Sequence, residues 1–505
     1  MSSKVFYGDT VLSVFPKGNQ DINTLSKYNV EEKVTVRISE TERAKIIPEN
    51  IANGITILGV EGTHQGGSIE GGYLVQFILE GEPYCNISVL AGDAVQEPSV
   101  PDAYVSVEWY TGQEGSGTKI LFPYTPVADI TLYAVAESKH LVGIQGFGTS
   151  DPSVTMFGDI ADIPMYTTET DGDYVSVINP LDNYWPFNKI EEFTDSNGNV
   201  FVKFPKMWMR WLEGSTTEHW IEGVRFANYK VDDNYFISDA FLDPKDTTGN
   251  TYLDYFAIGK YLSSGSESKI YSKGNQTILG GVMLGKVRSA ARAYGNSSNL
   301  YNGYQLLDIQ QLTIYNILCM MYYHTKNMMS VYDIHSGTAF TVSGTTDGVS
   351  GMNGWNTAYK TIKFLGIENP FGRYSVWADG ILFNNTTIYL CRFPQNYSDS
   401  TSNYLTMGFS RPTAGVVRRL RAGTSAGTKS VLYPSDSYTK TDWQENQNEY
   451  FGSFTSGYFN SSYVNGFYVG NFSELQGLFN YIGWDWVGNP SMSATGSSRL
   501  AYRPV

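Results

Sequence analysis

Alternating apolar and polar residues mark short strands along much of the chain, and the clearest pattern surrounds residues 366–381. An apolar run at 362–365 precedes this stretch, and the alternating segment 383–391 follows it. The stretch itself contains Gly, Asn and Pro, which favour a turn, and then Trp377 and Asp379. Two apolar strands joined by such a turn predict the centre of a compact β-rich domain.

A helical period runs through residues 304–323, where apolar residues recur about every 3.6 positions. This spacing predicts the best amphipathic helix of the chain, with residues 325–330 as a candidate continuation and Gly337 as its latest end. Methionines on this stripe are expected to fill the core, because the thioether adapts to irregular gaps. The periodic residues are Leu306, Ile309, Leu312, Ile314, Ile317, Met320 and Met321.

Residues 1–138 contain short predicted elements separated by turn residues. A helix is predicted to start at Ser39, and Pro48 opens a second one that Gly54 ends. Residues 65–72 form a flexible Gly/Ser linker. Strands are predicted at 5–7, 10–15, 55–60, 73–79, 86–90, 107–112 and 129–135. The expected parts of the chain are therefore 1–64, 65–72, 73–138 and 139–505.

Composition supports several ordered, β-rich domains. A length of 505 residues suggests three or four domains at about 100–200 residues each. Aromatic residues make up 14% and can bury enough area to order the chain, whereas charged residues make up only 17%. Loop tyrosines give a large contact area at low entropic cost, as in binding proteins, although tyrosine is also a good strand residue.

Charge, cysteine content and apolar runs limit the partners and the location expected for the chain. A net charge of −15 argues against nucleic acid, which needs a footprint of Lys and Arg. Cys85, Cys319 and Cys391 are scattered and match neither a metal site nor a disulfide framework, as expected for synthesis in a reducing cytoplasm. No apolar run reaches the roughly 18 residues of a membrane span, and the first residues lack the apolar core of a signal peptide. We therefore expect no membrane insertion.

Four aspartates between residues 154 and 174 raise the question of calcium. Their spacing does not match a calcium loop, so solvated loop carboxylates are the preferred interpretation, and we expect neither a metal nor another cofactor. These residues are Asp159, Asp162, Asp171 and Asp173.

The sequence Gly-Ile-Glu-Asn-Pro-Phe-Gly at 366–372, followed by Trp377 and Asp379, resembles the signature of C-type-lectin-like domains in phage tail receptor-binding proteins. Such domains are related to the formylglycine-generating-enzyme-like fold. The segments 197–211, 252–261 and 496–504 resemble the opening, middle and closing strands of the same domains, and Asn197-Gly198 is also a hairpin signal. The resemblance implies a C-type-lectin-like domain over 139–505. It assigns a structural role to Glu368, Asn369, Pro370, Gly372, Trp377 and Asp379.

Two further resemblances concern the first 138 residues. Residues 47–63 resemble an element of phage tail and baseplate proteins, which implies a virion attachment module, often trimeric, over 1–64. Residues 73–138 resemble the small β-grasp repeat of internalin, which implies a spacer with Trp109 and Tyr133 as core aromatics. The expected fold class is therefore α+β, β-rich and multidomain.

A Gly-punctuated loop at 480–493 is the candidate ligand site. Trp faces can stack on the C–H surfaces of sugars, and Asp and Asn side chains can bind sugar hydroxyls. The alternative is that Trp484 and Trp486 are buried strand aromatics. The candidate ligand-binding residues are Asn480, Tyr481, Trp484, Asp485, Trp486, Asn489, Ser491 and Ser493.

The sequence thus predicts a bacteriophage tail-fibre protein, located in the virion, that binds a host-surface glycan or protein during adsorption. Its other partners would be tail and baseplate proteins and further copies of itself in a homotrimer. No catalytic residues are expected, because no Cys follows Cys391 and the enzymes of the related fold use cysteines near the C-terminus. Two alternatives stay open: the variable ligand-binding protein of a diversity-generating retroelement, and a polysaccharide-degrading tail enzyme.

Overall fold

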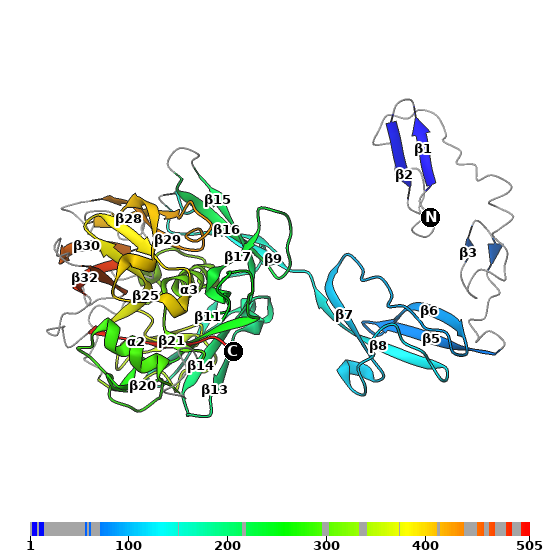
Figure 1. Cartoon of the computed structure of the whole chain (residues 1–505), viewed down its shortest axis with the longest axis horizontal. Coiled ribbons are helices and arrows are strands. Elements are labelled where there is room, and N and C mark those ends of the chain that lie inside the picture. Colours follow the sequence, from blue (N-terminus) through cyan, green and yellow to red (C-terminus); the bar gives the residue numbers. More distant parts are fainter. Residues whose placement is uncertain are drawn as a thin grey trace. The chain divides into compact units, whose positions relative to one another are not determined.

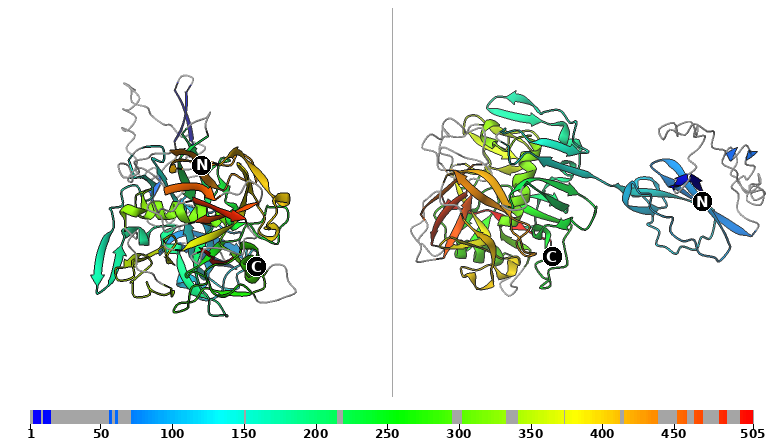
Figure 2. Two further views of the ribbon diagram at one scale, coloured as in Figure 1. Left: turned by 90° about the vertical axis from the view of Figure 1, so that its left-hand side faces the viewer. Right: turned by 90° about the horizontal axis from the view of Figure 1, so that it is seen from above.

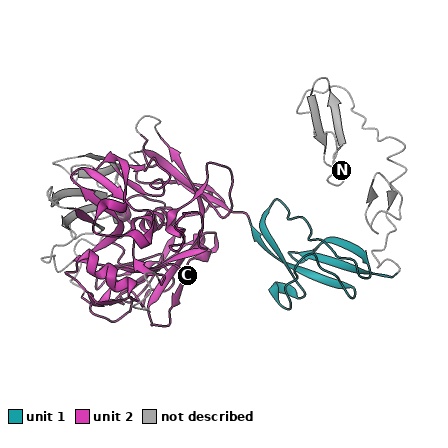
Figure 3. Cartoon of the chain, viewed as in Figure 1, with its two compact units in different colours: residues 1–138 teal, residues 139–505 magenta. Residues whose placement is uncertain are grey.

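The computed structural model divides into two compact units, Met1–Ser138 and Lys139–Val505 (Figure 3). This division falls where the sequence places the boundary between the spacer and the C-terminal domain. The described residues are 3–7, 10–14, 56–57, 60–61, 71–149, 151–214, 219–294, 302–332, 341–372, 374–411, 415–438, 452–458, 464–469, 481–486 and 496–504.

The first 64 residues contribute two small hairpins. Strand β1 (Ser3–Tyr7) pairs with β2 (Thr10–Val14), where the sequence predicts strands. The single strand predicted at 55–60 is instead a pair of two-residue strands, β3 (Thr56–Ile57) and β4 (Val60–Glu61). The helices predicted from Ser39 and Pro48 lie outside the described residues, as does most of the linker, and Gly72 already belongs to the next strand.

Residues 72–138 form a four-stranded sheet in the order β6-β5-β8-β7. Strands β5 and β8 are parallel, and the other neighbours are antiparallel. Trp109 is 2% exposed and packs edge-on against Phe77, with ring centroids 4.8 Å apart. The expectation for Tyr133 is wrong: it is half-buried, and its neighbour Leu132 fills the core because adjacent strand residues face opposite sides. The strands are β5 (Gly72–Leu79), β6 (Glu82–Leu90), β7 (Tyr104–Tyr110) and β8 (Ile130–Ser138).

Three five-stranded sheets form much of the C-terminal unit, in the orders β10-β9-β16-β15-β17, β11-β12-β22-β23-β24 and β13-β14-β18-β34-β21. The first contains β9 (Leu141–Gln145), β10 (Thr155–Gly158), β15 (Trp208–Glu213), β16 (Ile221–Ala227) and β17 (Phe236–Ile237). The second contains β11 (Thr167–Asp171), β12 (Tyr174–Ile178), β22 (Gly354–Asn356), β23 (Thr361–Phe364) and β24 (Ile367–Glu368). The third contains β13 (Glu191–Thr194), β14 (Val200–Pro205), β18 (Tyr255–Gly259), β21 (Tyr304–Leu306) and β34 (Leu500–Tyr502).

A nine-stranded sheet completes this unit, in the order β27-β26-β25-β31-β32-β30-β28-β29, with β33 added beside β25. Its strands are β25 (Ser375–Asn384), β26 (Thr387–Leu390), β27 (Leu405–Ser410), β28 (Gly415–Ala422), β29 (Leu432–Tyr438), β30 (Gly452–Tyr458), β31 (Asn465–Val469), β32 (Tyr481–Trp486) and β33 (Gly496–Ser497). A separate hairpin joins β19 (Ser264–Ser266) to β20 (Lys269–Tyr271).

Two α-helices accompany the sheets of the described chain, α2 (Leu284–Arg292) and α3 (Ile309–Tyr322). Neither is long and apolar enough to cross a membrane. Helix α3 lies in the middle of the C-terminal unit, enclosed by sheets (Figures 1 and 2). The β-rich architecture predicted from the sequence is confirmed.

Helix α3 differs from its prediction in one respect. Every residue from Ile309 to Tyr322 is buried, so the helix is enclosed on all faces and is not amphipathic. It begins at a capping box, in which Asp308 accepts hydrogen bonds from the backbone N–H groups of Gln310 and Gln311. It does not continue through 325–330, where a separate short 3₁₀ turn covers Met328–Ser330.

Two other segments also depart from their predicted backbone. The acidic segment 154–174 is not irregular throughout, because it contains β10 and β11. The alternation at 383–391 covers a turn rather than one strand: Asn385 has a φ of 53° and links β25 to β26. By contrast, the Asn197-Gly198 signal matches a turn between β13 and β14.

Candidate functional site

The turn that carries the signature is held by buried hydrogen bonds. The Glu368 carboxylate accepts hydrogen bonds from the backbone N–H of Gly344 at 2.9 Å and from both the N–H and the hydroxyl of Thr346 at 2.9 and 2.8 Å. Burial raises the pKa of Glu368. The fully buried guanidinium of Arg499 donates to the carbonyls of Glu368 and Asn369 at 2.7 and 3.1 Å, so residues near the C-terminus clamp this turn.

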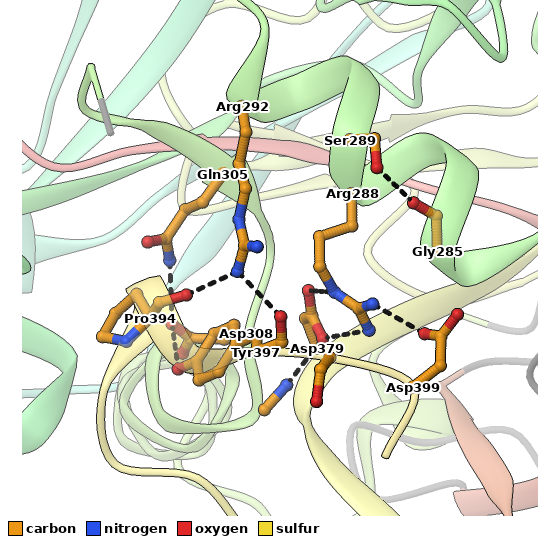
Figure 4. A network of polar contacts seen from close by, with 12 residues as sticks. Gly285, Arg288, Ser289, Arg292, Gln305, Asp308, Asp379, Pro394, Tyr397 and Asp399 are labelled. Atoms are coloured by element: carbon orange, nitrogen blue, oxygen red, sulfur yellow. Dashed lines mark hydrogen bonds and ion pairs between the residues drawn. The ribbon is translucent and has the colours of Figure 1, made fainter. Parts of the chain in front are cut away.

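Trp377 and Asp379, two further residues of the signature, are also buried. Trp377 is fully buried on β25 and donates its indole N–H to the carbonyl of Val282 at 2.8 Å. Asp379 forms a two-point ion pair with Arg288 of α2, with Oδ2 2.7 Å from Nε and Oδ1 2.9 Å from Nη2 (Figure 4). The remaining Arg288 nitrogen, Nη1, lies 2.6 Å from Asp399. Asp379, Arg288 and Asp399 therefore link β25, α2 and the loop at residue 399.

A second buried group lies beside this ion pair (Figure 4). The Asp308 carboxylate that caps α3 pairs with Arg503 at 2.7 Å and accepts hydrogen bonds from Gln305 at 2.8 Å and Tyr397 at 3.1 Å. Burial raises the pKa of Asp308, although Arg503 opposes this effect. Arg292 donates to the carbonyl oxygen atoms of Pro394 and Tyr397 at 2.7 and 3.0 Å. The network holds the C-terminal segment, both helices and the loop at 394–399 together; Arg288 and Arg503 pair with carboxylates within it, and Arg292 donates to backbone carbonyls.

The cysteines of the C-terminal unit have no features of nucleophiles. Cys319 and Cys391 are buried free thiols, and burial raises the pKa of Cys391 to about 12. A reactive cysteine needs a lowered pKa and access to a reagent. Among the described residues, no group of three or more His, Cys, Asp or Glu side chains could hold a metal ion.

Four of the predicted ligand-binding residues share one strand. Tyr481, Trp484, Asp485 and Trp486 lie on β32, so the loop expected at 480–493 is wrong for this part. Strand β32 is antiparallel to β31 and parallel to β30, and β31 in turn pairs with the signature strand β25. The candidate segment is therefore one strand removed from the signature within the same sheet. Asn480, Asn489, Ser491 and Ser493 lie outside the described residues.

Sequence reasoning missed a continuous row of six aromatic rings, of which four lie on the sheet β13-β14-β18-β34-β21, one on β20 and one just after α2. Centroid distances between successive rings are 5.9, 4.7, 5.1, 6.3 and 6.4 Å. All but Tyr294 are half-buried and so partly open to solvent. We call this the aromatic row; in order its residues are Tyr271, Tyr294, Tyr304, Tyr502, Phe193 and Tyr255. One local sequence signal could have indicated this row: Leu500 and Tyr502 alternate along the chain, as residues on one face of a strand do.

The middle of the aromatic row carries hydrogen-bonding groups. The Tyr304 hydroxyl donates to Asp195 at 2.7 Å and accepts a hydrogen bond from the Asn197 side chain at 3.3 Å. Burial, and then this bond to Asp195, raises the pKa of Tyr304. Burial also raises the pKa of Tyr294 to about 12, and its hydroxyl lies 3.0 Å from the Asn199 amide nitrogen. The row thus combines aromatic surface with polar groups.

Comparison of the chain with protein-family models and with curated protein sequences finds no match.

Proposed function

We propose that the chain is a receptor-binding protein of a bacteriophage tail. In this proposal, residues 1–64 attach to the virion, residues 73–138 form a β-grasp spacer, and residues 139–505 form a C-type-lectin-like domain. That domain binds a glycan or protein on the host surface. The sequence resemblances at 47–63 and 366–381 supply the biological context.

The observation that carries the proposal is the position of β32. Its Tyr481, Trp484, Asp485 and Trp486 are residue types that suit sugar binding, and its backbone is hydrogen-bonded into the sheet that contains β25. Binding residues mounted on strands are held more firmly than residues on a free loop. The buried ion pairs of Arg288 with Asp379 and of Arg503 with Asp308 hold elements of the same unit together.

Several copies would raise the strength of adsorption. A single sugar site binds weakly, but linked sites convert later contacts into intramolecular events with a high effective concentration. A homotrimer attached through residues 1–64 would supply this multiplicity. The proposal therefore includes binding without catalysis, and the partners are the host receptor and other tail proteins.

The test is binding of the full-length chain to bacterial cells and to an array of bacterial surface glycans, with Trp484→Ala and Trp486→Ala compared with the parent. Saturable binding that these substitutions weaken, with unchanged melting temperature, supports the proposal. Release of reducing sugar from the cells would instead identify a polysaccharide-degrading enzyme. The absence of binding to every cell and glycan tested would contradict the proposal.

A further inference from the structure

The aromatic row packs against a buried hydrophobic cluster, and five of its six rings are half-buried. Tyr304 and Tyr502 are direct cross-strand partners, and Tyr502 is also opposite Ala257. Phe201 is the cross-strand partner of Phe193, so it lies on the same face of the sheet; it is fully buried, and its ring centroid lies 5.6, 6.2 and 5.9 Å from those of Phe193, Tyr304 and Tyr502. Because four of the rings belong to one sheet and each ring contacts the next, they form a pre-arranged surface.

The backbone at Gly303 has a shape that accommodates Tyr502. Gly303 has a φ of +89°, and a Cβ atom there would lie 2.6 Å from Cε2 of the Tyr502 ring. Only glycine adopts this conformation without strain and leaves room for the ring. The chain therefore places the Tyr502 ring against bare backbone, beside Tyr304.

Two lysines give one end of the row an uncompensated positive charge. The Lys269 ammonium lies 5.5 Å from the Tyr271 ring and 5.9 Å from the Tyr294 ring, and the Lys273 ammonium lies 4.8 Å from the Tyr271 ring. Within the part of the chain that the structure describes, neither lysine forms an ion pair, whereas nearby Lys286 pairs with Glu267 at 2.7 Å.

The carboxylate closest to the middle of the row does not offset this charge by an ion pair. Asp195 accepts hydrogen bonds from the backbone N–H groups of Asn197 and Asn199, from the Asn199 amide and from the Tyr304 hydroxyl, all at 2.7 to 2.9 Å. Its oxygen atoms are occupied by donors of the turn at 195–199 and by Tyr304, and its negative charge lies near the middle of the row. Lys269 and Lys273 therefore concentrate positive charge at the Tyr271 end of the row, on a chain whose net charge is −15.

We propose that the aromatic row binds an acidic oligosaccharide. Tyr271, Tyr304 and Tyr502 would contact the C–H faces of the sugar rings. Lys269 and Lys273 would pair with a carboxylate or phosphate group that the sugar carries. This site shares no residue with β32, so it stands or fails independently of the site proposed there.

The arrangement fits an acidic sugar better than the other anionic polymer with stacking faces, single-stranded nucleic acid. Binding of nucleic acid uses a positively charged groove that follows every phosphate. Here two lysines lie at one end, and Lys203 at the other end is already paired with Glu191 at 2.8 Å. Sparse charge beside neutral aromatic surface matches a sugar polymer with few acidic groups.

Calorimetric titration of the full-length chain tests this inference with four probes: a galactose hexamer that carries one carboxylate, a galactose hexamer that carries one phosphate, the neutral galactose hexamer and a dT oligonucleotide. We expect an acidic hexamer to bind more tightly than the neutral hexamer, and the two acidic probes show which anionic group is preferred. The double variant K269Q/K273Q should bind that probe roughly tenfold more weakly. The matched variant K230Q/K245Q changes the charge equally at exposed lysines elsewhere in the unit and should bind like the parent.

A second variant, Tyr271→Ala, tests the aromatic contact and should weaken binding while the melting temperature shows that the unit stays folded. Equal binding of acidic and neutral probes, failure of all the sugar probes to bind, or tighter binding of the oligonucleotide would each overturn the inference. Loss of sugar binding in Trp484→Ala with no effect of the lysine variants would also overturn it, because that result places the sugar on β32.

Discussion

Arg288 on α2 and Asp379 on β25 form a buried two-point ion pair, with side chains only 6% and 2% exposed. The pair connects a helix to the strand that follows the signature turn, and Asp399 extends it to a third segment. A carboxylate in this position is a structural element, since its oxygen atoms are used by the guanidinium.

Replacing Asp379 by Asn should therefore reduce stability strongly. The substitution leaves the Arg288 charge buried with its main partner gone, which costs about 3–5 kcal/mol. The free energy of unfolding, measured by urea denaturation, should fall by this amount. Asp254→Asn is the matched control, because Asp254 pairs with Lys206 at the surface and is 89% exposed. That control should change stability by less than about 1 kcal/mol. Equal effects of the two substitutions would contradict the structural role of Asp379.

Gly303→Ala should be more costly than an alanine at an open glycine. The new Cβ would lie 2.5 Å from the Arg503 carbonyl oxygen and 2.6 Å from the Tyr502 ring, in a backbone conformation that disfavours side chains. We expect a loss of about 1–3 kcal/mol in the free energy of unfolding. Gly172→Ala is the control: it also has positive φ, +56°, but its Cβ would meet nothing within 4 Å. If both variants lose the same stability, the close approach of the Arg503 carbonyl and the Tyr502 ring to Gly303 is not significant.

Trp109→Ala should destabilise the N-terminal unit and leave the C-terminal unit folded. Trp109 is a core residue of the four-stranded sheet, and its removal should cost about 3–5 kcal/mol. Tyr133→Ala should cost less, because Tyr133 is only half-buried. Calorimetric scanning of the full-length chain would show the lower-temperature shift of one transition only. A larger effect at Tyr133 than at Trp109 would reverse our assignment of the core.

Tyr294 gives an expected pH dependence on the alkaline side. Burial raises the pKa of Tyr294 to about 12, whereas an unfolded tyrosine titrates near 10. The folded state thus favours the neutral phenol, and this contribution to stability is fully present below about pH 10 and is lost as the pH rises through about 12. In Tyr294→Phe, the loss of stability between pH 10 and 12 should be smaller, and the absorbance titration at alkaline pH should lose one late-titrating tyrosine. An unchanged titration would contradict the buried environment of Tyr294.

Local patterns were sufficient to place several elements. The apolar run at 362–365 and the helical period at 304–323 locate β23 and α3, because side-chain periodicity follows backbone geometry. The full enclosure of α3 was not predictable, since it depends on sheets from distant parts of the chain. Tyr133 was misassigned because Leu132 beside it is also apolar, and a shift of one residue exchanges the two faces of a strand.

The aromatic row was beyond sequence reasoning for a different reason. Its rings come from segments between Phe193 and Tyr502, and only the pairing of β18, β34 and β21 brings Tyr255, Tyr502 and Tyr304 together. Each tyrosine alone looks like an ordinary strand residue. The candidate residues on β32 were chosen because they are close in sequence and stay a prediction; their backbone was mistaken for a loop because glycines interrupt the segment.

Adsorption of the full-length chain to bacterial cells is the most direct test of the proposed function, with Trp484→Ala as the variant and Tyr184→Ala as its control. Tyr184 is an exposed aromatic residue of the same unit outside β32. We predict saturable binding that Trp484→Ala weakens and Tyr184→Ala leaves unchanged, while the melting temperature of both variants stays near that of the parent. Equal binding by the folded Trp484→Ala variant and the parent would contradict the β32 site, and no binding to any cell tested would contradict a receptor-binding function.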